Sequence, residues 1–192
     1  MARVVKYKRM PFDSLGKKLF AFLLGELASI WIVAAAAIML LPTVVPMQFN
    51  WSGVATSSGL NSTLIAIALV FSIVPIVILI VSLLRFRIVN YHPYLLNTPS
   101  FYNIVKRVPS SRRSYWVNKY FETLLVAGVY LSGILLILIL EIYTAASKDY
   151  LNGYLGIIAP LIAIVAVCVL LIILIKDMYK KMALEANRKR RR

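Results

Sequence analysis

Four apolar stretches, each long enough to cross a membrane, restrict what this chain can fold into. About 20 apolar residues in a helix cross the hydrocarbon core of a bilayer. A strand of a membrane barrel would show alternation of apolar and polar residues, which these stretches lack, so each predicts a transmembrane helix. The chain is therefore expected to be an all-α integral membrane protein. The four predicted helices are Leu19 to Leu41, Leu64 to Leu84, Tyr120 to Tyr143 and Tyr154 to Ile175.

Composition supports this fold class. Apolar residues make up 61% of the chain, against roughly 45–50% in soluble globular proteins, and lipid can cover that excess where water cannot. The 192 residues suffice for one membrane domain, 1–192, which we expect to be an antiparallel four-helix transmembrane bundle. The single cysteine, Cys168, excludes an internal disulfide scaffold.

The distribution of positive charge predicts how the helices are oriented. Of the 22 Lys and Arg residues, all but Lys148 lie before the first helix, in loop 85–119 or in tail 176–192. Loops rich in Lys and Arg stay on the cytoplasmic side. Both termini are therefore expected in the cytoplasm, with the protein in the cell (plasma) membrane.

The basic segments predict contact with anionic lipid headgroups, each Lys or Arg near the surface contributing about 1 kcal/mol. An acidic soluble partner is a weaker alternative, and nucleic acid is the least favoured. The residues expected to contact anionic lipid are Arg85, Arg87, Lys106, Arg107, Arg112, Arg113, Arg188, Lys189 and Arg190.

Loop 85–119 is the longest predicted segment outside the membrane. Helical spacing of apolar residues predicts a short interfacial helix near Ser100 to Val108. Asn118 is expected to cap the third long helix, with Glu122 in its first turn. The aromatic residues expected to form a belt at this interface are Tyr91, Tyr94, Phe101, Tyr102, Tyr115 and Trp116.

The first external loop, Pro42 to Thr63, is uncharged and offers two glycosylation motifs. Asn50-Trp51-Ser52 and Asn61-Ser62-Thr63 both match N-x-[ST]. Asn61 lies so near the second helix that a glycosyltransferase is less able to reach it. Asn50 and Asn61 are thus candidate glycan sites, and chance matches are the alternative in a loop rich in Ser and Thr.

Glu26 is the one deep acid, and ionisable residues at membrane depth are costly and often functional. It would act in a proton or cation pathway, or contact a substrate. The plainer interpretation is a protonated or hydrogen-bonded Glu that faces Ser72, Ser132 or a lipid headgroup, because an ion pathway usually shows several deep polar residues.

Three of the helices carry pairs of small residues four apart, a spacing that lets transmembrane helices approach closely. Such pairs serve packing inside one bundle or contact with partner subunits. The pairs are Gly25 and Ser29, Gly128 and Ser132, and Ala159 and Ala163.

No constellation for chemistry is recognisable in the sequence. His92 is the only histidine and has no ligand-spaced partner, and no phosphate loop or nucleophile motif occurs. We therefore expect no metal, no cofactor and no enzyme activity. The leading hypothesis is a non-catalytic subunit or scaffold of a larger membrane complex. The alternative is a small transporter or channel for an ion or small solute, with Glu26 in the pathway and kinks at Pro75 and Pro160.

Overall fold

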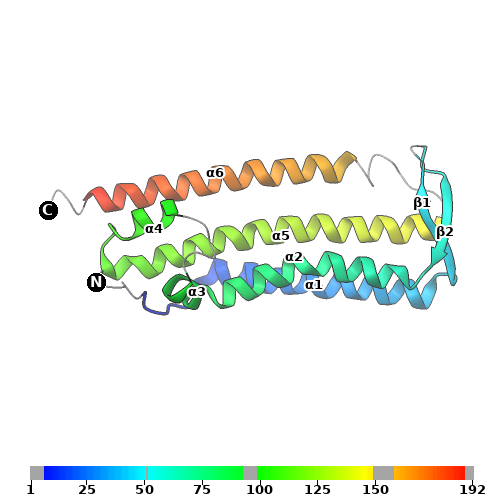
Figure 1. The fold of residues 1–192 in the computed structure, drawn as a ribbon, viewed down its shortest axis with the longest axis horizontal. Helices are drawn as coiled ribbons and strands as arrows, with labels where there is room; N and C mark the ends of the chain where they lie inside the picture. Colours follow the sequence, from blue (N-terminus) through cyan, green and yellow to red (C-terminus); the bar gives the residue numbers. More distant parts are fainter. Residues whose placement is uncertain (1–6, 51, 93–98, 149–157, 189–192) are drawn as a thin grey trace.

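The computed structural model describes residues 7–50, 52–92, 99–148 and 158–188, with the side chains of residues 99, 100 and 188 left aside. The described chain is mostly helical and includes one two-stranded sheet (Figure 1). Its elements, in order, are α1 (Ser14–Leu40), β1 (Val44–Phe49), β2 (Ala55–Leu60), α2 (Thr63–Leu83), α3 (Arg85–Tyr91), α4 (Pro99–Val105), α5 (Ser110–Lys148) and α6 (Ala159–Arg188).

Within the described residues, four helices, α1, α2, α5 and α6, are long and apolar enough to cross a membrane, which confirms the predicted number of membrane-length helices. Successive long helices run in opposite directions along the molecule (Figure 1). One end, here called the basic end, carries residues 7–13, α3, α4, the start of α5 and the end of α6. The other, the hairpin end, carries β1 and β2 (Figure 1).

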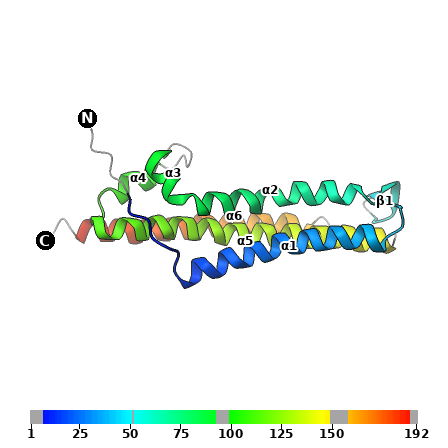
Figure 2. The same ribbon diagram turned by 90° about the horizontal axis from the view of Figure 1, so that it is seen from below.

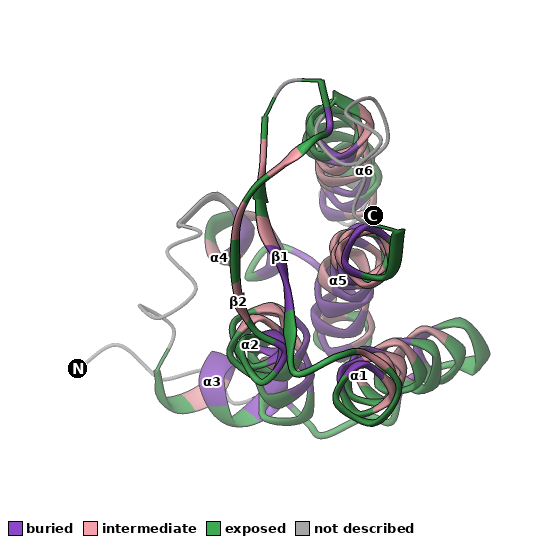
Figure 3. Ribbon diagram, turned by 90° about the vertical axis from the view of Figure 1, so that its right-hand side faces the viewer, coloured by how far each residue is buried: buried purple, intermediate pink, exposed green. Residues whose placement is uncertain are grey.

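The long helices do not pack equally. Helices α1, α2 and α5 all contact one another, whereas α6 contacts α5 and α4 (Figure 3). Close approach of the first three depends on Gly128: a Cβ there would lie 3.0 Å from an Ile78 methyl and 3.1 Å from a Leu23 methyl. One of the small-residue pairs predicted from sequence, Gly128 and Ser132, thus serves internal packing.

The larger apolar core lies at the basic end. Phe101, Val105 and Phe121 are fully buried there, together with Met182 of α6. Toward the hairpin end a smaller cluster is formed by Ile30, Ala34, Ala68 and Ile139.

The predicted aromatic belt is wrong for two of its members. Phe101 of α4 and Trp116 of α5 are buried in the core, because α4 and α5 both pack against α6. The Trp116 indole also donates a hydrogen bond of 2.8 Å to Glu185 of α6. Tyr91 is exposed as expected, and Tyr94 lies outside the described residues.

The all-α prediction is wrong for the loop between α1 and α2, which forms an antiparallel hairpin of β1 and β2. At its turn, the Asn50 side-chain oxygen accepts hydrogen bonds from the backbone N–H groups of Ser52 and Val54. Gly53 adopts a positive φ of 79°, a conformation in which a Cβ is unfavourable. Pairing between the strands satisfies backbone groups that an irregular loop would leave to water.

Several predicted helix ends are also wrong. Helix α5 begins at Ser110, so Asn118 lies inside it and caps nothing. Helix α6 continues through the expected tail to Arg188. Helix α1 begins at Ser14, where the Asp13 side chain caps it by accepting a hydrogen bond from Gly16 N–H.

The two prolines proposed as kinks are placed differently. Pro75 lies inside α2 as predicted. Pro160 is the second residue of α6, a position in the first turn where a missing N–H costs nothing. The short helix predicted near Ser100 is confirmed as α4.

Gly128→Val should destabilise the protein by about 1–3 kcal/mol, because the added methyl groups overfill the contact between α5, α2 and α1. Unfolding of the purified protein in detergent would measure this. Gly25→Val is the matched control, since a Cβ at Gly25 meets no atom within 4 Å. Equal stability of the two variants would contradict this account of the packing.

Candidate functional site

A buried arginine organises the basic end. Arg85 follows directly on the end of α2, and its side chain points inward and is only 9% exposed. Its guanidinium donates hydrogen bonds to the Asn118 side-chain oxygen (2.8 Å), the Ser82 carbonyl (2.9 Å) and the Met10 carbonyl (2.8 Å). It also lies 3.7 Å from the centroid of the Phe12 ring. One side chain therefore joins α2, α5 and the N-terminal segment.

The N-terminal segment, residues 7–13, is held mainly through its backbone. Asn118 donates to the Pro11 carbonyl at 2.7 Å, and Ser114 donates to the Lys8 carbonyl at 2.7 Å. Asn90 of α3 both accepts from Tyr7 N–H and donates to the Tyr7 carbonyl. Figure 2 shows α1 leaning away from α2 toward this end, so the segment runs back across the helix ends. Polar side chains of α3 and α5 thus satisfy a segment without secondary structure.

Two acids complete this cluster. The Lys119 ammonium lies 2.8 Å from Asp13 Oδ2 and 2.6 Å from Glu122 Oε2. Glu122 is 4% exposed, and its other oxygen, Oε1, has no hydrogen-bond partner among the described residues. Two cations, Arg85 and Lys119, face two carboxylates, so the buried charge is compensated. We call Asp13, Arg85, Asn118, Lys119 and Glu122 the Arg85 cluster.

The surroundings shift the pKa values of Asp13 and Arg85. The hydrogen bond from Lys119, and then that from Gly16 N–H, lowers the pKa of Asp13 to about 2. Burial lowers the pKa of Arg85, which the charge of Glu122 opposes. A guanidinium still stays protonated at neutral pH, because its ordinary pKa exceeds about 12. Asp13 and Arg85 are therefore both charged at neutral pH.

Glu26 is a second polar site, in the middle of α1. It is the thirteenth residue of this 27-residue helix, about 18 Å from its start. Its Oε1 lies 3.1 Å from the position of a Cβ on Gly133, so the carboxyl group lies against α5. Its Oε2 is buried without a hydrogen-bond partner in the described chain, as is Ser132 Oγ. Ser72 instead donates to the Ala68 carbonyl of its own helix.

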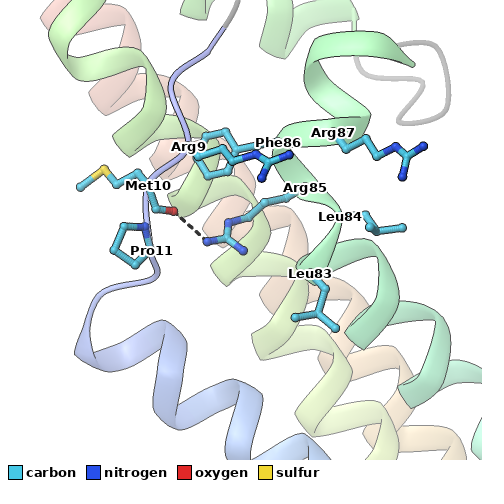
Figure 4. A pocket seen from close by; sticks show the side chains of 8 residues that line it. All are labelled: Arg9, Met10, Pro11, Leu83, Leu84, Arg85, Phe86 and Arg87. Carbon is cyan, nitrogen blue, oxygen red and sulfur yellow. Dashed lines mark hydrogen bonds between the residues drawn. The ribbon is translucent and has the colours of Figure 1, made fainter.

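A pocket of about 410 Å³ lies beside the Arg85 cluster. It is lined by residues 9–11 of the N-terminal segment and residues 83–87 at the junction of α2 and α3. Figure 4 shows Arg85 turned toward the Met10 carbonyl, whereas Arg87 extends away from it. The pocket thus joins an arginine-rich wall to the apolar end of a membrane-length helix.

Metal binding finds no support in the described part of the chain, where no three His, Cys, Asp or Glu side chains group together. The clustered acids pair with lysine and arginine instead.

Comparison with known proteins gives one informative match. An uncharacterized protein of Archaeoglobus fulgidus is 37% identical over 122 residues, which cover 64% of this chain and 67% of the archaeal protein. This chain belongs to the same family as that archaeal protein. No family model and no solved structure matches the chain. The likeness shows kinship and assigns no activity.

The residues predicted to contact anionic lipid are placed in different surroundings. Arg87, Lys106 and Arg107 are exposed, as the prediction requires. Arg112 pairs with Glu185 at 3.1 Å, and Arg113 donates to the carbonyls of Val108 and Lys106. Arg85 is buried and engaged as described above. The side chains of Arg188, Lys189 and Arg190 lie outside the described residues.

The two candidate glycan sites also differ. Asn50 is exposed at the hairpin turn. Asn61 is 9% exposed, and its Nδ2 donates to the carbonyls of Ile38 and Leu41 at 3.5 and 3.4 Å. A glycan on Asn61 would have to displace those hydrogen bonds. Glycosylation of either residue stays a prediction.

Arg85→Leu should destabilise the protein by about 3–5 kcal/mol, because it leaves the Asn118 side-chain oxygen and the Met10 and Ser82 carbonyls without their hydrogen-bond donor and removes one of the two cations near Glu122. Thermal unfolding in detergent would measure the loss, and limited proteolysis would show release of residues 7–13. The exposed Arg87→Leu is the control. A stable Arg85→Leu protein with a protected N-terminal segment would contradict the role given to Arg85.

Proposed function

We propose that this chain is a non-catalytic subunit or scaffold of a larger membrane complex. In this proposal its four long helices form an antiparallel bundle in the plasma membrane, with the basic end in the cytoplasm. The clustering of basic residues in α3, in the segment 106–107 that follows α4, at the start of α5 and at the end of α6 supports that orientation. The Arg85 cluster supports the non-catalytic role, because its charged groups are occupied by their own ion pairs.

The outward face of α1 is the observation that carries the proposal. Gly25 is exposed, a Cβ there would meet nothing within 4 Å, and the exposed residues Ala21 and Ala28 lie on the same side of the helix. This glycine brings no internal contact, unlike Gly128. Small residues let the backbones of two transmembrane helices approach closely. An outward small face therefore suits a helix of a partner subunit.

Helix α6 supports the same proposal. Its last turns are anchored by Met178, Met182 and Ala186, which are buried. Its membrane-length part is almost wholly exposed, with Val167 buried and Leu161, Val165 and Ile172 at least half exposed. Such a helix has room for a neighbour on either flank.

Purification from native membranes in mild detergent should yield a stable complex with other membrane proteins. Gly25→Leu should release the chain from that complex, because the larger side chain holds the partner helix away. Ala66→Leu, at an exposed small residue of α2, is the matched control and should leave the complex intact. Recovery of the chain alone, or equal loss with both variants, would contradict the proposal.

A small transporter or channel is the second candidate, and Glu26 favours it. Its Oε2 is buried at mid-helix without a protein partner in the described chain, and such a group suits the transient binding of a proton or cation. On α5, the Ser132 hydroxyl oxygen is likewise buried without a hydrogen-bond partner in the described chain.

Glu26→Gln tests this second candidate, because glutamine keeps the shape of the side chain but cannot ionise. In liposomes, the purified protein should show ion or solute flux that this substitution abolishes. Ser29→Ala, one turn away on α1, is the control. Flux absent from the unaltered protein, or unchanged by Glu26→Gln, would remove the candidate.

A further inference from the structure

We propose that the pocket between residues 9–11 and 83–87 binds one anionic phospholipid, with its phosphate at Arg9 and Arg87 and an acyl chain along α2. This inference is independent of the proposed function, because it concerns the molecule's own contact with its membrane.

The positive charges that line the pocket favour binding of an anion. Three arginines line it, Arg9, Arg85 and Arg87, and no acid does. Arg85 is committed to the protein by three hydrogen bonds. Arg9 and Arg87 are both exposed, and neither forms an ion pair within the described residues. Arginine binds phosphate oxygens through two N–H groups at once, so these two side chains are suited to hold a phosphate.

The remaining lining is apolar and exposed, which selects an amphiphile over a soluble anion. Met10 and Leu84 are each 42% exposed, and Leu83 is 64% exposed. The exposed apolar surface continues along α2 through Ile80 and Val77. A free phosphate would leave this surface uncovered, whereas a phospholipid would cover it with an acyl chain.

The position of the pocket fits the same ligand. It lies where α2, whose 21 residues include no charged side chain, gives way to the arginines of α3. That transition marks the level of lipid headgroups for a spanning helix. The buried Arg85 fixes both walls, since it ties Met10 to the end of α2.

Native mass spectrometry of the full chain in detergent, titrated with phosphatidylglycerol or phosphatidylcholine, tests the proposal. The unaltered protein should retain one phosphatidylglycerol more tightly than phosphatidylcholine. The double variant Arg9→Ala/Arg87→Ala should bind phosphatidylglycerol at least about tenfold more weakly, given about 1 kcal/mol per basic residue. Lys106→Ala/Arg107→Ala, which removes two exposed charges from the same end, should bind normally.

Two further measurements distinguish a phospholipid site from a site for a soluble anion. Leu83→Gln, at an exposed apolar position, should also weaken binding of phosphatidylglycerol, because it disturbs the path of the acyl chain. Inorganic phosphate at millimolar concentration should not displace the lipid. Equal weakening by both double variants would show general surface attraction. Displacement by phosphate, or normal binding by Leu83→Gln, would show a site for a soluble anion. Any of these results would overturn the proposal.

Discussion

The burial of a single arginine at the end of a membrane-length helix is the constraint on which the basic end depends. A guanidinium removed from water must find partners for its donors and a balancing charge. Arg85 finds hydrogen-bond acceptors on three separate segments: Met10, Asn118 and the end of α2. Satisfying that one group therefore fixes residues 7–13 against α5, and positions Asp13 to cap α1. The large apolar core that includes Phe101 and Phe121 packs around the same junction.

The two ends of the molecule are consequently stabilised in different ways. The basic end has buried aromatic residues, ion pairs and side-chain-to-backbone hydrogen bonds, as a soluble domain has. Toward the hairpin end the helices depend on close packing at small residues, because lipid removes the hydrophobic drive for helix association. Ala34 and Ala68 provide that packing inside the group of α1, α2 and α5. Helix α6 takes part fully in the contacts at the basic end, but little in the close packing toward the hairpin end.

Whether a feature of the fold could be predicted from sequence depends on how far apart in the chain its interacting residues lie. The four long helices were predictable, because apolar length is a local property. The start of α5 at Ser110 was not, since Ser114, Trp116 and Asn118 look like polar loop residues until their partners Lys8, Glu185 and Arg85 are known. The hairpin was missed because a loop rich in Ser and Gly has weak strand propensity, although Asn50 and Gly53 are turn residues that indicated it. The pocket also required the fold, because Arg9 and Arg87 are far apart in the chain.

Two ionisable groups lie against α5, and they differ in how well their polar atoms are satisfied. Arg85 at the basic end has hydrogen bonds, a stacked ring and a nearby carboxylate. Glu26 in mid-helix has one buried oxygen without a partner in the described chain. A buried ionisable group whose polar atoms have partners is accommodated by the fold, whereas a buried oxygen without a partner costs free energy that the fold alone does not recover. The proposed transport function is therefore best tested at Glu26, where Gly133 lets the carboxyl group lie directly against the backbone of α5.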